Sequence, residues 1–155
     1  MTVAFFGHAD FIGDSQDERK LLSLLEEVVG EAEVDFLLGE YGRFDRFARE
    51  CARKYREKHA VARLIFVTPY FISEQTAEEK RRRFVPFDTI LYPPLENVPL
   101  RFCIARRNRW MVERADVVIC CVSHSYGGAY EAYRYAVRKR KKLYNLAARS
   151  VEGKE

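Results

Sequence analysis

The amino-acid sequence predicts an α/β fold, a doubly wound and mostly parallel sheet of five to six strands with helices on both faces. Short apolar runs alternate along the chain with longer segments whose apolar residues recur every three or four positions. One run, residues 117–122, is apolar throughout, as expected of a central strand that is buried on both faces. The length of 155 residues suits one domain, which we place at 1–150, with an insert at 73–87 and a short polar tail at 151–155.

The first half of the chain contains three expected strands and two expected helices. The strands are short apolar runs, each followed within two residues by glycine or proline: 3–6, 34–38 and 64–67. Ser15 and Glu18 have the spacing of a capping box, which predicts the start of a helix that Gly30 ends. A second helix is predicted over residues 44–55, where the apolar side chains share one helical face.

The second half continues this alternation. Residues 73–87 are polar and basic without a clean period, so we expect an insert or loop with some helix. The remaining strands are expected at 88–92, 117–122 and 143–146. The helices are expected at 104–115 and 128–140. Because strands and helices alternate, the crossover connections of a parallel sheet are predicted.

Composition argues against several classes of protein. No apolar run approaches the roughly 20 residues that span a bilayer, and the N-terminus does not have the pattern of a signal peptide. We therefore expect a cytoplasmic protein with no membrane partner. No CxxC pair occurs, which predicts reduced thiols and no metal site. The four thiols concerned are Cys51, Cys103, Cys120 and Cys121.

The net charge of +4 is too small to indicate a nucleic-acid partner, which we regard as disfavoured. Most of the excess charge lies at residues 81–83 and 138–142. A solvated insert and a solvated helix end are the simpler interpretation, because cations suit a helix C-terminus. A polyanionic partner is the alternative.

Glycines mark the ends of the expected strands, where parallel sheets bind ligands. Gly127 and Gly128 lie between the strand at 117–122 and the next helix. Glycine has no Cβ and permits positive φ, so the N–H groups of that helix can hold a phosphate. A tight turn without a ligand explains the pair equally well, although Gly7 and Gly39 at other strand ends favour the phosphate. No GxGxxG or Walker A motif occurs, which disfavours a standard NAD dehydrogenase or P-loop ATPase.

Four segments together resemble the SLOG superfamily, Rossmann-like domains related to DprA and to the LOG phosphoribohydrolases. They are FFGHAD, TPY, RRNRWMVERADVVICCVS and YGGAYEAYRYAVRKRKKLYNL. The likeness is greatest to the small YpsA-like branch, in which a GHR-like start, an RN-x-x-MV-x-x-SD segment and a GGT-x-x-x-x-x-YA segment recur. The resemblance spans nearly the whole chain. It implies a sheet that binds a nucleotide or a nucleotide-derived small molecule.

The resemblance also implies roles for single residues. The Gly-Gly loop of the superfamily holds phosphate, which supports the phosphate interpretation of Gly127 and Gly128. LOG enzymes hydrolyse the N-glycosidic bond of nucleoside monophosphates with an Arg, matched here by Arg107, and a Glu. That Glu has no match, because its position falls on Ala132 or Arg134 in the two registers of the glycine pair. Binding or sensing is therefore favoured over hydrolysis.

Three functions remain open at this level. The first is binding or sensing of a nucleotide-type small molecule. The alternative is an N-glycosidic hydrolase or transferase, with Arg107 and either Glu131 or Glu40 in the active roles. Glu40 and Asp45, which flank Gly42, are a weaker candidate for a carboxylate pair near a ribose. A nucleic-acid-associated protein is the third. No cofactor is expected, and a homodimer fits the aromatic surplus and the habit of the family.

The expected ligand-binding residues lie at strand ends and at the starts of two helices: Gly7, His8, Gly39, Pro69, Tyr70, Arg107, Asn108, Ser123, Gly127, Gly128 and Ala129. His8 is either a phosphate donor or general acid, or a loop histidine without a ligand. Arg107 either pairs with a phosphate or is a solvated helix residue.

Overall fold

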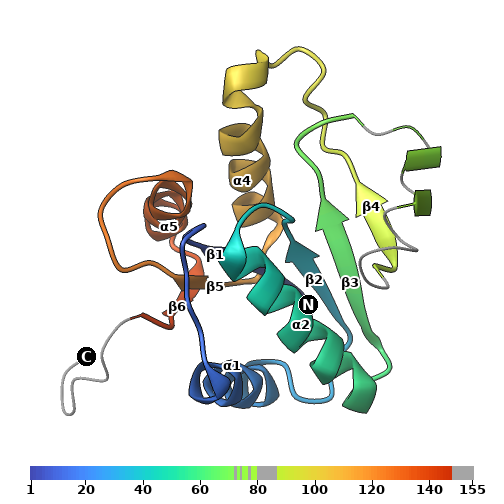
Figure 1. The fold of residues 1–155 in the computed structure, drawn as a ribbon, viewed down its shortest axis with the longest axis vertical. Coiled ribbons are helices and arrows are strands. Elements are labelled where there is room, and N and C mark those ends of the chain that lie inside the picture. The colour runs from blue at the N-terminus through green and yellow to red at the C-terminus, as the bar shows by residue number, and fades with distance from the viewer. Residues whose placement is uncertain (72, 74, 77, 80–86, 148–155) are drawn as a thin grey trace.

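The computed structural model describes residues 1–71, 73, 75, 76, 78, 79 and 87–147. Its sheet has six strands in the order β4-β3-β2-β1-β5-β6, and every pair of neighbours is parallel (Figure 1). The strands are β1 (Thr2–Gly7), β2 (Val34–Leu38), β3 (Ala62–Val67), β4 (Thr89–Leu91), β5 (Val117–Cys121) and β6 (Lys142–Asn145). The predicted α/β class and the parallel, doubly wound sheet are confirmed.

Helices cover both faces of this sheet (Figure 1). They are α1 (Ser15–Val28), α2 (Arg43–Lys58), α4 (Cys103–Arg114) and α5 (Gly128–Arg138), and a short 3₁₀ turn, η1 (Leu100–Phe102), leads into α4. Side chains of α1 and α2 share one hydrophobic core with the sheet, and side chains of α4 and α5 share the other. The candidate site lies at the carboxyl ends of the strands, where helices of both layers come together.

The alternation of side chains along β1 explains its continuous apolar sequence. Val3 and Phe5 belong to the core under α1 and α2, whereas Ala4 and Phe6 belong to the core under α4 and α5. Successive residues of a strand point to opposite faces, so a strand covered on both sides needs an apolar residue at every position. β5 follows the same rule. The prediction that β5 is the central strand is wrong. It is an interior strand, but it lies next to the edge strand β6, and the two central strands are β1 and β2.

The predicted capping box of the first helix is displaced by one residue. Asp14 is the N-cap, and its carboxylate accepts the N–H groups of Gln16 at 3.0 Å and Asp17 at 2.9 Å. The carboxylate of Asp17 accepts the N–H of Asp14 at 3.0 Å. Ser15 and Glu18 have the same spacing but lie inside the helix. The aspartate pair therefore performs the capping expected of Ser15 and Glu18.

The insert predicted at 73–87 lies largely outside the described residues, as do the basic cluster at 81–83 and the whole tail at 151–155. In the part of the chain that the structure describes, no helix is long and apolar enough to cross a membrane.

The cysteines lie apart from the site. Cys51, Cys103 and Cys120 are buried, Cys121 is half-buried, and all four are free thiols. Burial raises the pKa of Cys51 and of Cys120 to about 12, so both are protonated at neutral pH. Among the described residues, no three His, Cys, Asp or Glu side chains gather as ligands for a metal.

Candidate functional site

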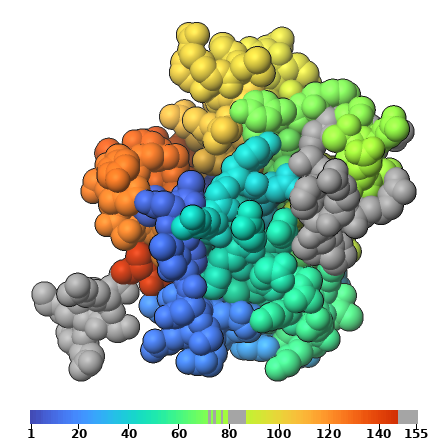
Figure 2. All heavy atoms as spheres, viewed as in Figure 1, coloured from blue at the N-terminus to red at the C-terminus, as the bar shows by residue number. Residues whose placement is uncertain are grey.

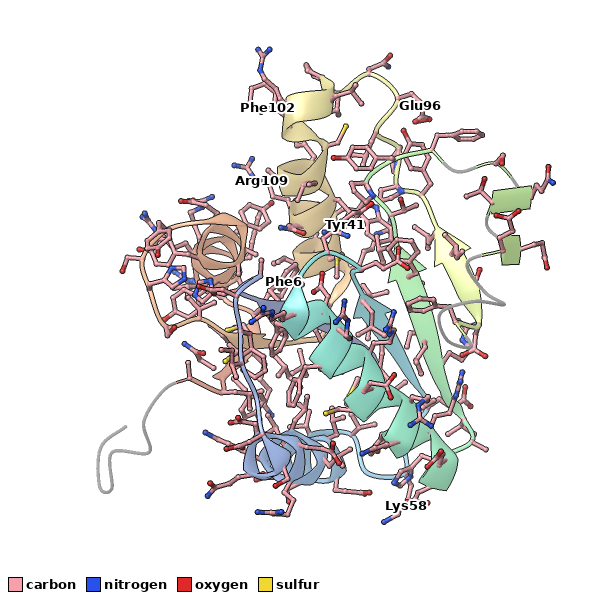
Figure 3. All side chains as sticks on the ribbon, viewed as in Figure 1. Phe6, Tyr41, Lys58, Glu96, Phe102 and Arg109 are labelled. Carbon is pink, nitrogen blue, oxygen red and sulfur yellow. The ribbon has the colours of Figure 1, made fainter. Side chains whose placement is uncertain are left out.

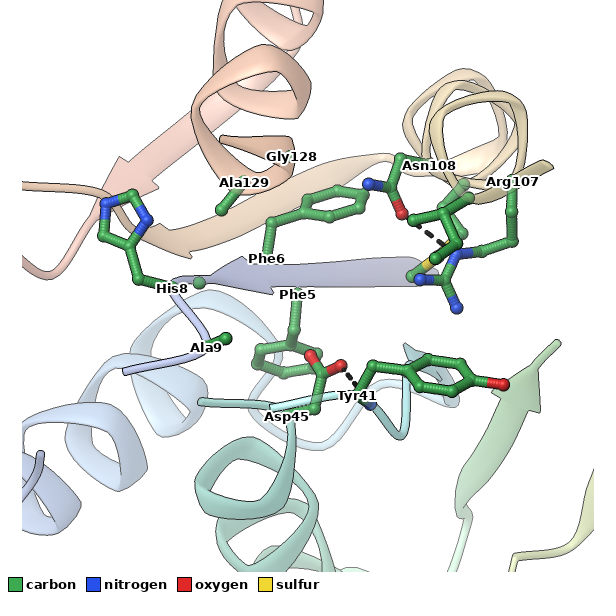
Figure 4. A pocket seen from close by; sticks show the side chains of 14 residues that line it. Phe5, Phe6, His8, Ala9, Tyr41, Asp45, Arg107, Asn108, Gly128 and Ala129 are labelled. Carbon is green, nitrogen blue, oxygen red and sulfur yellow. Dashed lines mark hydrogen bonds between the residues drawn. The ribbon is translucent and has the colours of Figure 1, made fainter. Parts of the chain in front are cut away.

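A cavity of about 170 Å³ lies at the carboxyl ends of β1 and β2, against α4 and the first turn of α5 (Figure 4). The chain runs from β1 to α1 on one face of the sheet and from β5 to α5 on the other face. In open parallel sheets, such a switch point is where ligands bind. Figure 2 shows the surface where α4 in yellow, α5 in orange and the segments after β1 and β2 in blue and cyan come together.

Arg107 of α4 lines this cavity and is buried, with 5% of its surface exposed. Its Nε donates to Oδ1 of Asn108 at 2.9 Å, and its Nη1 donates to the carbonyl of Val67 at 2.6 Å. Burial lowers the pKa of Arg107, opposed by the carboxyl of Asp45, but an arginine remains charged in proteins. Among the described residues, no carboxylate forms an ion pair with it. The cavity therefore contains a buried positive charge that no carboxylate of the described residues contacts as an ion pair, although the carboxyl of Asp45 acts on it from a distance.

Asp45 of α2 lies on the other side of the cavity from Arg107 (Figure 4). Its Oδ2 accepts the backbone N–H of Tyr41 at 2.8 Å. Burial raises the pKa of Asp45 to about 6, although the Tyr41 hydrogen bond and the charge of Arg107 both oppose the rise. Gly39 lies between the two charged groups, because a Cβ there would be 2.6 Å from Oδ2 of Asp45 and 3.4 Å from Nη1 of Arg107. The cavity thus combines a fixed cation with a carboxyl that titrates close to neutral pH.

The first turn of α5 has free backbone N–H groups beside the cavity. Gly127 is the N-cap, with φ 94° and ψ 172°, a conformation that residues with a Cβ avoid. No side chain caps the helix, and no acceptor among the described residues takes the N–H of Gly128, Ala129 or Tyr130. Gly128 and Ala129 form part of the cavity wall. Of the two glycines, Gly127 therefore has the expected positive φ, and Gly128 lines the cavity.

His8 holds the loop between β5 and α5 in place. Its Nε2 accepts the backbone N–H of Ser123 at 3.1 Å and that of His124 at 3.4 Å. Its ring stacks on the ring of His124, with 3.4 Å between the centroids. Burial lowers the pKa of His8, and the nearby His124 adds to the effect. An Nε2 that accepts two N–H groups is unprotonated, so His8 is neutral with its proton on Nδ1. This geometry supports a structural role for His8 rather than a role as phosphate donor or general acid through Nε2.

Most of the expected ligand-binding residues line this one cavity: Gly7, His8, Gly39, Arg107, Asn108, Gly128 and Ala129. Pro69, Tyr70, Ser123 and Gly127 do not. Tyr70 is close by, with its ring 6.4 Å from that of Tyr41. Glu131 lies outside as well, in a groove between α4 and α5, so the two catalytic candidates Arg107 and Glu131 line different cavities.

Sequence analysis did not assign several residues of the wall: Phe5, Phe6, Ala9, Tyr41, Ile104 and Met111. Asp45 was considered only together with Glu40. The signal for Asp45 was its place three residues after Gly42, in the first turn of a helix that follows a strand end. No comparable local signal marks Tyr41, whose backbone rather than its ring holds Asp45.

Comparison with known proteins places the fold. No protein-family model and no curated protein matches the sequence. A solved structure of DNA processing protein A from Helicobacter pylori matches with a TM-score of 0.64 and 19% identity, over 98% of this chain and 67% of that chain. The fold is similar to that of DNA processing protein A. DNA processing protein A, or DprA, is a Rossmann-like protein of the SLOG superfamily, and the similarity to it covers nearly the whole of the present chain. The study of the H. pylori protein concerns how that protein binds single-stranded DNA.

Proposed function

We propose that the cavity at the ends of β1 and β2 binds a nucleotide or a nucleotide-derived small molecule through a phosphate group, in a binding or sensing role. The observation that carries this proposal is the buried guanidinium of Arg107, with which no carboxylate of the described residues forms an ion pair. A buried cation is stable only when it is paired and hydrogen-bonded, and a phosphate supplies both the charge and the acceptors.

The start of α5 supports the same ligand. The N–H groups of Gly128 and Ala129 border the cavity that Arg107 lines, and the helix dipole places partial positive charge there. The N–H groups bind phosphate through hydrogen bonds, while Arg107 neutralises its charge from α4. The motif likeness to the YpsA-like branch, noted for RN-x-x-MV and the glycine pair, points to a nucleotide as the bearer of that phosphate.

The proposal is tested first by native mass spectrometry of freshly purified protein for a retained nucleotide. Calorimetric titration then compares the four nucleoside monophosphates with adenosine and inorganic phosphate. If the phosphate is the anchor, AMP or another monophosphate binds and adenosine does not. An absence of binding by every phosphate-bearing probe would overturn the proposal.

Arg107→Met removes the cation while keeping an unbranched side chain in its place. Charge-assisted hydrogen bonds contribute roughly 1.5–3 kcal/mol each, so monophosphate affinity should fall about tenfold to a hundredfold. Arg106→Met is the matched control, because Arg106 is the neighbouring arginine of the same helix but is exposed. Equal losses in the two variants would show that only net charge matters and that Arg107 is not a specific ligand.

A second candidate is hydrolysis of a nucleotide N-glycosidic bond, and the observation that favours it is Asp45. A carboxyl with a pKa of about 6 in the cavity of Arg107 has the proton affinity of a general base at neutral pH. Release of free base from AMP, lost in Asp45→Asn and retained in Glu131→Gln, would support this function. Binding of AMP without base release would favour the sensing role.

A further inference from the structure

A second and larger cavity of about 330 Å³ lies between α4 and α5. Its wall combines apolar side chains with several charged ones: Arg101, Ile104, Ala105, Asn108, Arg109, Gly128, Glu131, Ala132, Tyr135 and Arg138. Figure 3 shows Arg109 projecting from α4 on the side of α5. The cavity is open to solvent and lies next to the phosphate site proposed above.

The two cavities meet at shared residues. Ile104, Asn108 and Gly128 line both of them. The first cavity, at about 170 Å³, is smaller than the roughly 300 Å³ at which ligand pockets of proteins usually begin. A ligand anchored by Arg107 therefore extends beyond the first cavity. On its way into the second cavity it lies against Gly128, which lines both.

The backbone does not require a glycine at position 128. The glycines with positive φ among the described residues are Gly30, Gly42 and Gly127. A Cβ at Gly128 would meet only Nδ2 of Asn108, at an ordinary 3.9 Å, whereas a Cβ at Gly7 would collide with the ring of Phe44. Alanine is also the better helix former. The missing side chain at Gly128 thus leaves open space at the junction of the two cavities, with no packing or backbone reason within the fold.

The charges of the second cavity indicate what can lie there. Arg101, Arg109 and Arg138 line it, against the single carboxylate of Glu131. The guanidinium groups of Arg109 and Arg138 each lie 5.3 Å from the ring centroid of Tyr135. No ion pair within the described part of the chain involves these three arginines. The surface is suited to an anionic group next to a flat apolar one, because arginine binds phosphate and aromatic rings stack on it.

We infer that the ligand has two parts, a phosphate at Arg107 and a second nucleoside or further phosphate in the cavity between α4 and α5, joined over Gly128. This inference rests on the function proposed above and narrows its ligand to the class of dinucleoside polyphosphates and similarly extended nucleotides. Gly128 is a specificity-determining residue in this arrangement, because it admits the linking phosphates between the helices.

The test compares AMP with diadenosine diphosphate and diadenosine tetraphosphate by calorimetric titration. The parent should bind at least one dinucleoside polyphosphate about tenfold or more tightly than AMP, through the added charge-assisted contacts. In the double variant Arg109→Gln and Arg138→Gln this advantage should disappear, while AMP affinity stays within about twofold of the parent value. Arg106→Gln is the control, since Arg106 is exposed on the same helix and lines neither cavity.

Gly128→Ala tests the passage itself. The variant should unfold at the same or a higher denaturant concentration than the parent and should lose about tenfold in affinity for the dinucleoside polyphosphate, with a smaller loss for AMP. The denaturation midpoint separates this result from misfolding.

Three outcomes would overturn the inference. If AMP binds but the second nucleoside adds nothing, the ligand has one part, and the proposed function stands alone. If neither binds, both fail. If a ten-nucleotide oligothymidylate binds more tightly than the dinucleoside polyphosphates, with steep salt dependence, the occupant of the second cavity is a nucleic-acid strand rather than a small molecule.

Discussion

Replacing Asp45 by asparagine should stabilise the ligand-free protein at pH 8. Burial lifts the pKa of this carboxyl from 3.8 to about 6 in the folded state. The folded state then binds more protons than the unfolded state between these values, so the contribution of Asp45 to stability falls as pH rises through that window. Asparagine keeps an oxygen for the Tyr41 N–H and has no charge to bury.

The size of the effect follows from the same pKa. A rise of this extent corresponds to roughly 3 kcal/mol of unfavourable free energy for the ionised form, because one pKa unit is about 1.4 kcal/mol. The side chain of Asp45 is only half-buried, so solvent reduces part of this cost. We therefore expect Asp45→Asn to raise the free energy of unfolding by about 1–3 kcal/mol at pH 8. At pH 4, where the folded carboxyl is protonated, the variant and the parent should be almost equally stable.

Urea unfolding followed by circular dichroism at pH 4 and pH 8 measures both differences. Glu57→Gln is the control, because Glu57 is exposed on the same helix and its surface ion pair with Arg53 is worth only about 0.2–1 kcal/mol. The reasoning is wrong if Asp45→Asn is no more stable than the parent at pH 8, or if its gain is the same at both pH values. A gain in stability together with a loss of AMP binding would show that the carboxyl is kept for the ligand rather than for the fold.

Two further predictions concern the glycines that start helices and the buried histidine. Gly127→Ala should lower the free energy of unfolding by about 1–3 kcal/mol, because residue 127 has a positive φ. Gly42→Ala should lower it further, because φ is positive there too and the new Cβ would lie 2.7 Å from Cα of Ala9. Urea denaturation that ranks the two variants in the reverse order would contradict this. His8 has a pKa below its ordinary 6.5, so the stability that it contributes is present above pH 6.5 and is lost as pH falls below that value. His8→Gln, which does not titrate, should show a flatter fall in unfolding free energy between pH 6.5 and 5 than the parent, and equal slopes would refute the assignment.

The fold could be predicted from sequence because its signals are local. Strands covered on both faces, such as β1 and β5, have an apolar residue at every buried position, and α2 has a single apolar face. The start of α1 was misplaced because two adjacent pairs of residues have the same capping spacing. Only the backbone conformation at Asp14 decides between them.

The site could be predicted only in part, for a related reason. The rule that ligands bind at strand ends depends on topology and indicated Gly7, Gly39 and the glycine pair, whereas the resemblance to the LOG enzymes indicated Arg107. The role of His8 as an acceptor depends on a contact with Ser123, far along the chain, and no local pattern encodes it. The pKa of Asp45 depends in the same way on burial by segments that only the folded chain brings together.

The position of β1 also has a consequence for how the protein is made. One edge of β1 pairs with β2, which follows it closely, but the other pairs Val3 with Val117. At about 5–20 residues per second, the ribosome needs roughly 6–23 s to synthesise the chain between these two partners. During that interval the nascent chain has an open apolar strand edge and no α4 or α5 to cover one face of the sheet. Chaperones and proteases can therefore compete with folding for several seconds in every round of translation.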